Sequence, residues 1–373
     1  MKSSLHCRSV RPLALAVLGF WALAASSQPR YALTDLGQLP GSAGCIANGL
    51  NDSGDVVGHC APLNENFNQT GFVWRAGTMS ATGVLAGGHY SLATAINGFG
   101  TVVGDGDTGN LRPQSWVLKG GQLANVFPNN GGNTHALFVA DAGWIGGYYT
   151  RSLSGNTSSW KGAIWTPDPK DPRKWRLSDL PVLPGGVDPK YSSSIPAAFN
   201  QLGQAAGYAT NDQIGQHAAF WNADAGRSVV DLGTHPGDWS SLAWGLNDLG
   251  QVVGESHPPF GSRPVLWQND ATHSVVALPL PAGDNQGMAT AINNLGQVLG
   301  STWVGRPGSW ERGPARVVIW RDGGVFVLQD LLDPVSAAGC TLWSASAING
   351  RGQIAANASC AGGGRAVLLT PLN

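Results

Sequence analysis

Short apolar runs separated by turn-forming residues extend over almost the whole chain, and they repeat. One phrase, Asn-x-x-Gly-Gln-Val-Val-Gly, recurs with variations in seven copies, whose first residues lie 43 to 60 positions apart. Asn favours the first position of a type I turn and Gly the fourth, so each copy is predicted to be a turn followed by a strand. Its Asn is therefore expected to have a structural role. The copies occupy residues 51–58, 97–104, 140–147, 200–207, 247–254, 293–300 and 349–356.

Each copy belongs to a unit of four strand-sized segments. In the fifth unit these segments are 242–246, 251–255, 264–267 and 275–278. The third segment ends in a large apolar residue, which we expect to pack against the neighbouring unit. These residues are Trp74, Trp116, Trp165, Trp221, Trp267, Trp320 and, in the last unit, Leu369. Seven units of four short strands are typical of a β-propeller or of an open β-solenoid.

The two ends of the chain favour the propeller. The last unit stops after its third segment, whereas residues 31–37 precede the first unit and contain Asp35-Leu36-Gly37, which matches Asp231-Leu232-Gly233 in a fourth segment. Pairing of the two ends would cover an open sheet edge. We therefore predict an all-β fold with a single domain at residues 31–373. The predicted architecture is a seven-bladed β-propeller of four-stranded antiparallel blades, closed by the N-terminal strand, which completes the last blade.

The first residues have the pattern of a secretory signal peptide at 1–26. Lys2, Arg8 and Arg11 precede an apolar run at 12–25, and small residues place the cleavage site near residues 24–26. The run is shorter than a membrane span of about 20 residues, although an uncleaved anchor is the alternative. We expect the mature chain to be a secreted or periplasmic monomer without a membrane span.

Four cysteines remain after this cleavage, as expected for disulfides in an oxidising compartment. Counting outward from the turn at 51–54 places Cys45 opposite Cys60. The same count from the turn at 349–352 leaves Cys340 one residue out of register with Cys360, which a β-bulge would absorb. We predict the disulfides Cys45–Cys60 and Cys340–Cys360. Metal binding by these cysteines is disfavoured because no Cys-x-x-Cys or paired His accompanies them.

The charged residues are few, and their positions suggest a repeated ion pair. Charged residues make up only 12% of the chain and the net charge is −1, without a basic or acidic block, so no nucleic-acid partner is expected. A basic residue near the start of the third segment is predicted to face an acidic residue of the fourth in four units. The predicted pairs are Lys161 with Asp179, His217 with Asp231, Arg316 with Asp330, and Arg365 with Asp35.

The repeat resembles the HAF repeats of extracellular bacterial proteins. The residues that carry the resemblance are His217-Ala218-Ala219-Phe220-Trp221, the phrase Ala-Ile-Asn-Asn-Leu-Gly-Gln-Val-Leu-Gly at 291–300, and Val-Asp-Leu-Gly-Thr at 230–234. It spans about residues 31–372. The resemblance implies export and a repeat fold, and it implies no particular reaction.

Sequence signatures of catalysis are absent. The chain contains no His-Glu-x-x-His, no Gly-x-Ser-x-Gly and no phosphate-binding Gly loop, and no cofactor is expected. Asp105 and Asp107 resemble half of a calcium loop, but the distal bidentate Glu is missing. They are a weak candidate metal site.

Loops between the second and third segments, with the unit-joining loops on the same face that contain Trp239, are the best candidate ligand site, because binding residues usually lie on loops of a rigid scaffold. Exposed aromatic and basic residues there would suit a glycan or an extracellular protein, although they could instead pack under their own loops. The function favoured is a binding or structural module; the alternative is a glycan-cleaving enzyme that uses Glu255 and Glu311 as acid and base. The candidate ligand-binding residues are Tyr148, Tyr149, Trp160, Tyr208, Trp239, Phe260, Trp303, Arg306 and Trp310.

Overall fold

The computed structural model describes residues 30–372, except for 64–67, 127–131, 153–157, 186–191 and 212–214. Within these residues the chain consists of β-strands and one 3-10 turn, η2 (Leu328–Leu331). No described helix is long and apolar enough to cross a membrane. The predicted all-β fold is confirmed, and the predicted signal peptide lies outside the described residues.

Five sheets have four antiparallel strands each. The first contains β2 (Ser42–Leu50), β3 (Val56–Pro62), β4 (Thr70–Arg75) and β5 (Thr78–Ala81). The second contains β6 (Ser91–Ile96), β7 (Val102–Gly106), β8 (Gln114–Lys119) and β9 (Gln122–Asn125). The third contains β18 (Ser240–Leu246), β19 (Val252–His257), β20 (Arg263–Trp267) and β21 (Val275–Ala277). The fourth contains β22 (Gln286–Ile292), β23 (Val298–Trp303), β24 (Arg316–Arg321) and β25 (Gly324–Val327). The fifth joins β26 (Thr341–Ile348), β27 (Ile354–Cys360) and β28 (Gly363–Pro371) to β1 (Tyr31–Asp35).

A larger sheet of eight strands combines two further sets of four. A parallel bridge between Lys161 and Ser194 connects the two sets. One set is β10 (Thr134–Val139), β11 (Ile145–Ser152), β12 (Ser158–Asp168) and β13 (Asp171–Asp179). The other is β14 (Ser193–Phe199), β15 (Ala205–Asn211), β16 (Gly215–Trp221) and β17 (Val229–Gly233). The predicted four-stranded antiparallel unit is therefore the building block of the whole described chain.

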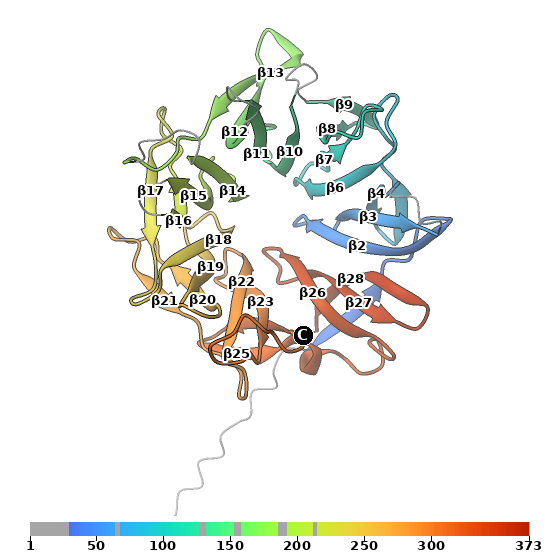
Figure 1. Cartoon of the computed structure of the whole chain (residues 1–373). Coiled ribbons are helices and arrows are strands. Elements are labelled where there is room, and N and C mark those ends of the chain that lie inside the picture. The colour runs from blue at the N-terminus through green and yellow to red at the C-terminus, as the bar shows by residue number, and fades with distance from the viewer. Residues whose placement is uncertain are drawn as a thin grey trace, which may run out of the picture.

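Figure 1 shows the sheets arranged around a common axis, with the first strand of each unit nearest to it. Each of these strands carries a β-bulge, seen as a register shift against the second strand. A bulge inserts one extra residue and re-aims its side chain. The extra residues line a pocket on the axis, so the bulges decide which side chains face it. They are Asn48, Thr94, Leu137, Ala197, Trp244, Thr290 and Ser346.

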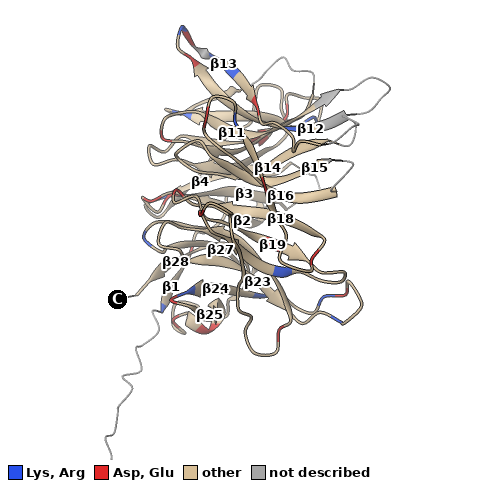
Figure 2. Cartoon of the chain, turned by 90° about the vertical axis from the view of Figure 1, so that its left-hand side faces the viewer, with Lys and Arg blue, Asp and Glu red and all other residues tan. Residues whose placement is uncertain are grey.

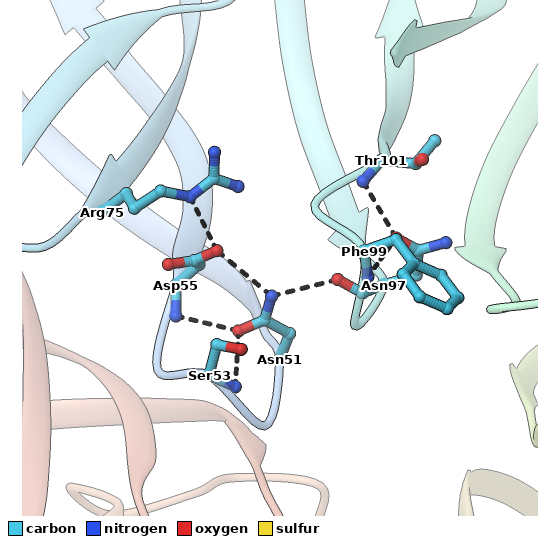
Figure 3. A network of polar contacts seen from close by, with 7 residues as sticks. All are labelled: Asn51, Ser53, Asp55, Arg75, Asn97, Phe99 and Thr101. Atoms are coloured by element: carbon cyan, nitrogen blue, oxygen red, sulfur yellow. Dashed lines mark hydrogen bonds and ion pairs between the residues drawn. The ribbon is translucent and has the colours of Figure 1, made fainter. Parts of the chain in front are cut away.

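The repeated Asn forms the turn that was predicted from its spacing to Gly. In the first copy the N–H of Gly54 donates to the carbonyl of Asn51. The side-chain oxygen of Asn51 also accepts from the N–H groups of Ser53 and Asp55, at 3.0 and 2.9 Å (Figure 3). Asn97 accepts from Phe99 and Thr101 in the same way. The side-chain oxygen thus satisfies backbone donors that the turn leaves unpaired.

The same Asn side chains also connect neighbouring units. The amide nitrogen of Asn51 donates to the backbone carbonyl of Asn97 at 3.0 Å, and that of Asn97 donates to Ala140 at 2.9 Å. Asn200, Asn247, Asn293 and Asn349 each make the equivalent bond to the next copy, the last to Asn51. Ala140 occupies the Asn position in the third copy and has no amide to donate. One residue type therefore builds both the turn and the contact between turns.

The large apolar residues predicted at the end of each third segment, here called the column, occupy equivalent positions in six of the seven units. Trp165, Trp221, Trp267, Trp320 and Leu369 are buried, whereas Trp74 is only partly so. Each lies opposite the first apolar residue of its second strand. Trp116 instead lies opposite Gly104, which is the register of Phe72 in the first unit. Leu118 takes the column position there, opposite Val102.

The amino-terminal segment pairs with the carboxy-terminal strand, as predicted. β1 is antiparallel to β28, in a register that puts Tyr31 opposite Pro371 and Asp35 opposite Val367. Tyr31 is 1% exposed and belongs to the apolar core beneath β26–β28. Burial of this ring adds packing to the strand pairing.

Both predicted disulfides are present, between Cys45 and Cys60 and between Cys340 and Cys360. Cys45 and Cys60 are directly opposed in the register of β2 and β3. In the last unit a register shift between Leu342 and Ser344 supplies the expected bulge. The first bridge joins β2 to β3, and the second joins the residue just before β26 to the end of β27.

Ion pairs follow the prediction only in part. His217 pairs with Asp231 at 3.0 Å and Arg365 pairs with Asp35 at 3.3 Å. Arg316 does not pair with Asp330; its guanidinium contacts Asp284 at 2.8 Å, because the loop before β22 brings that carboxylate to the start of β24. The pair of Lys161 with Asp179 stays a prediction. Figure 2 shows the charged residues scattered over loops and strand ends.

Candidate functional site

Pockets follow one another along the axis. The pocket at the end formed by the Asn turns has a volume of about 260 Å³. A second pocket, of about 240 Å³, shares with it the apolar residues Leu50, Ile96, Phe138, Phe199, Leu246, Ile292 and Ile348. A third, of about 380 Å³, shares Leu137, Ala197, Trp244 and Thr290 with the second. Side chains thus divide the axial space into a polar turn end, an apolar middle and an aromatic end.

The third pocket, here called the aromatic pocket, is lined by aromatic side chains from neighbouring units. Tyr148 of β11 and Tyr208 of β15 each follow the Gly that ends the repeated phrase, and Trp244 is the bulge residue of β18. Leu137, Ile195, Pro196, Ala197 and Thr290 complete the lining. A concave, mostly apolar pocket with a few polar groups is the usual form of a small-ligand site.

Glycine places the two tyrosines in register. A side chain at Gly147 would collide with the carbonyl oxygen of His135, and one at Gly207 with that of Ile195. Only Gly permits the bulged first strand to come this close to the second strand. The residue after each Gly, Tyr148 or Tyr208, is therefore the first position with room for a large side chain. Its ring then lies beside the neighbouring unit.

The rings form two contacting groups, one around Tyr208 and one around Tyr148. The centroids of Tyr208 and Trp244 are 6.2 Å apart at an interplanar angle of 70°. Tyr148 stacks on His135 at 4.7 Å, and its edge meets Trp160 at 5.3 Å. Neither the Tyr148 nor the Tyr208 hydroxyl has a hydrogen-bond partner among the described residues, so both can bond a ligand. Burial raises the pKa of both phenols, which keeps them protonated at neutral pH.

Glu255 supports the pocket from behind Trp244. It is 5% exposed and accepts hydrogen bonds from the indole N–H of Trp244 at 3.0 Å and from the Ser262 hydroxyl. His257 Nε2 lies 3.4 Å from the carboxylate. Burial alone would raise the pKa of Glu255, but the bonds from His257, Ser262 and Trp244 outweigh it and lower this pKa overall. Glu255 is therefore ionised at neutral pH.

A second carboxylate lies beyond Tyr148. Asp105 binds the ring nitrogen Nδ1 of His135 at 2.7 Å and accepts the N–H of Ala136 at 3.0 Å. Burial raises the pKa of Asp105, against the bonds from His135 and Ala136 that lower it. The carboxylate orients the imidazole that stacks on Tyr148.

Asp105 and Asp107, the weak candidate metal site, are engaged in internal hydrogen bonds. Asp107 accepts from His89 Nδ1 at 2.8 Å and from the backbone N–H groups of His89, Gly109 and Leu111. Burial raises the pKa of Asp107, but these bonds lower it overall. Both carboxylates thus serve internal hydrogen bonds. The described residues contain no group of three potential metal ligands.

The other predicted residues lie in different surroundings. Phe260 and Trp310 form an exposed ring pair with centroids 6.1 Å apart, and Arg306 pairs with Glu311 at 3.1 Å on the same loop as Trp310. Trp239 is 61% exposed and donates its N–H to Pro258. The Tyr149 hydroxyl donates to Asp179.

Trp303 is not an exposed ligand residue. It is 2% exposed, donates its N–H to Gln286 at 2.9 Å, and lies under the Arg312 guanidinium at 4.6 Å. This Trp packs under its own long loop, which is the alternative that the sequence left open for the whole set.

Trp244 and His135 are the site residues that the loop-based expectation missed. Both lie on first strands, close to the axis. The available signal was position: Trp244 stands three residues before Asn247, where the other copies carry smaller residues such as Thr94 and Ser346. A bulge is needed to make that position face the pocket, and the bulge is not visible in the repeat phrase.

No protein-family model and no curated protein matches this chain. Among solved structures, the β-propeller domain of the trilobed protease from Pyrococcus furiosus is similar over 87% of this chain and 95% of that chain, with 10% identity and a TM-score of 0.51. The acylaminoacyl peptidase of Pyrococcus horikoshii is similar over 88% of this chain and 51% of its own, with 12% identity and a TM-score of 0.52. At these identities the similarity concerns the fold alone. The fold of this chain is that of a β-propeller.

Proposed function

We propose that this chain is an exported, closed, seven-bladed β-propeller with HAF repeats that binds a glycan in the aromatic pocket. The blade number is supported by the division of the eight-stranded sheet at the Lys161–Ser194 bridge, which leaves two four-stranded units beside the five other sheets. Closure is supported by the pairing of β1 with β28 and by the hydrogen bond from Asn349 to Asn51. Export is supported by the signal-like first residues and the two disulfides.

The observation that carries the binding proposal is the aromatic pocket itself. Tyr148, Tyr208 and Trp244 come from adjacent units and surround a space of about 380 Å³. Aromatic faces pack on the C–H faces of sugar rings, and the two free phenol hydroxyls provide directional bonds to sugar hydroxyls. The pocket is large enough for one pyranose unit.

The direct test is binding of the mature chain, residues 27–373, to a broad glycan array, followed by calorimetry with the best ligand. Tyr208→Ala is expected to weaken binding at least about tenfold, because it removes one face and one hydroxyl of the pocket. Phe99→Ala is the matched control, since Phe99 is 81% exposed on an Asn turn at the other end of the axis. Loss of binding in Trp310→Ala instead would move the site to the exposed Phe260–Trp310 pair. Absence of any glycan ligand would overturn the proposal.

A hydrolytic function receives less support. A general acid needs a raised pKa, whereas that of Glu255 is lowered and its carboxylate is occupied by internal donors. Glu311 is exposed and paired with Arg306. Turnover of a glycan that is abolished by Glu311→Gln would nevertheless establish the enzyme.

A further inference from the structure

The surroundings of the aromatic pocket contain acidic groups, but its lining contains no basic side chain. Carboxyl groups stand behind aromatic side chains on two of its sides: Glu255, whose pKa is lowered, behind Trp244, and Asp105, whose pKa burial raises, behind the His135–Tyr148 stack. The described bases nearest to them, His257 and His135, are each held by one of these carboxylates. Nothing in the lining therefore offers a positive charge to an anionic ligand.

The bond from Trp244 to Glu255 strengthens this bias. The indole donates its edge N–H to the Glu255 carboxylate at 3.0 Å, and the same side chain lines the pocket. Donation to an anion increases the electron density of the ring and makes its face a better partner for a cation. Tyr208, whose ring lies 6.2 Å from that of Trp244, adds a second face at a steep angle. Two inclined aromatic faces with a carboxylate behind them are the arrangement used to bind ammonium groups.

We infer that the aromatic pocket selects a cationic group, and that its ligand is a glycan with free amino groups. This inference rests on the proposed glycan-binding function and adds the class of sugar. An amino sugar would stack its ring on one aromatic face and direct its ammonium group toward the Trp244 and Tyr208 faces. A neutral N-acetylated sugar of the same shape would keep the stacking and lose the cation–π attraction.

Calorimetry with two oligosaccharides of equal length tests this inference: β-1,4-linked glucosamine and its fully N-acetylated counterpart. At pH 6, where the amines are largely protonated, the glucosamine oligomer is expected to bind about tenfold more tightly, as one desolvated cation–π contact predicts. Glu255→Gln keeps the shape of the buried side chain and removes its charge, so it should reduce this ratio several-fold. Trp244→Phe keeps an aromatic face without the N–H bond to Glu255 and should also reduce the ratio, so it serves if Glu255→Gln does not fold.

The outcomes separate the two proposals. Equal affinity for the two oligomers, with binding still lost in Tyr208→Ala, would overturn the amine preference and leave glycan binding intact. A preference that persists unchanged in both Glu255→Gln and Trp244→Phe would also overturn it, because the selective charge would lie elsewhere. Binding of neither oligomer, and of no other glycan on the array, would overturn both proposals.

Discussion

Asn349 donates its side-chain amide to the backbone oxygen of Asn51 at 3.0 Å, although 298 positions separate the two residues in sequence. The bond repeats the one that Asn51 makes to Asn97 within the first two units. The last Asn turn therefore contacts the first Asn turn through the same kind of hydrogen bond that connects Asn51 to Asn97. This relation, together with the pairing of β1 with β28, is the structural basis of the proposed ring.

Removing the Asn of a repeated turn should destabilise the folded chain. Asn247→Ala deletes two acceptor bonds to backbone N–H groups, from Leu249 and Gln251, and the bond to the Asn293 carbonyl. Leaving buried backbone groups unpaired should lower the free energy of unfolding by about 1–3 kcal/mol. Chemical denaturation monitored by far-UV circular dichroism measures it. A change below about 0.5 kcal/mol would contradict a structural role for this Asn.

The third copy offers the converse test. Ala140 stands at the Asn position, and six other copies accommodate Asn there. Ala140→Asn should supply the missing bonds and raise the free energy of unfolding by about 1 kcal/mol. Ala142→Asn, on the exposed part of the same turn, is the control and should have no such effect. Destabilisation by Ala140→Asn would show that the third copy packs differently from the others.

The amino-terminal strand should contribute to global stability. Tyr31→Ala removes a buried ring from the core beneath β26–β28 and should cost about 3 kcal/mol or more. Tyr31→Phe is the matched control: it keeps the ring and loses only a long contact to Arg321, so most of the stability should remain. Equal and small effects of both changes would contradict a structural role of β1.

The disulfides should stabilise the first and last units. Replacement of Cys340 and Cys360 by Ser opens a link that spans 20 residues and should cost about 2–4 kcal/mol. Thermal unfolding with and without reductant checks this: the double variant should unfold at a lower temperature and respond less to reductant than the native chain. An unchanged Tm in the variant would be inconsistent with the observed bridge.

Glu255 should make stability depend on pH on the acidic side. Burial would raise its pKa, but the bonds from His257, Ser262 and Trp244 lower this pKa overall, so the folded state holds the ionised form more strongly than the unfolded state does. Its contribution is present above the unfolded pKa of about 4.3 and is lost as the pH falls through the lower folded pKa. The loss of unfolding free energy between pH 6 and pH 3 should therefore be smaller in Glu255→Gln than in the native chain. An equally steep loss in both proteins would argue against a lowered pKa.

Periodicity alone predicted most of the fold, because each unit repeats the same turn and the same strand lengths. The turn at Asn51, the pairing of β1 with β28 and the opposition of Cys45 to Cys60 all follow from counting residues. Trp116 shows where counting residues fails. It was aligned with the other Trp residues because of its residue type, but it lies two residues before Leu118, which occupies the equivalent position in the strand. Arg316 shows a second limit, since its partner came from a loop whose path sequence periodicity does not describe.

The site was predicted less completely, for a specific reason. Of the aromatic residues predicted near loops, Tyr148 and Tyr208 line the aromatic pocket and Trp160 contacts Tyr148, whereas Trp303 fitted the same description and is buried. Trp244 was missed because its exposure to the axis depends on the bulge in β18, and His135 was missed because it contacts the site only by stacking on Tyr148, opposite it in the register of β10 and β11. Whether a side chain lines the pocket is therefore determined by the register of its strand and not by its residue type.

The most direct measurement is a crystal structure of the mature chain with the tightest-binding glycan from the array. We expect electron density for a sugar ring between Tyr148, Tyr208 and Trp244, at the end of the axis opposite the Asn turns. Sugar density on the Phe260–Trp310 pair, with the aromatic pocket filled only by solvent, would contradict it.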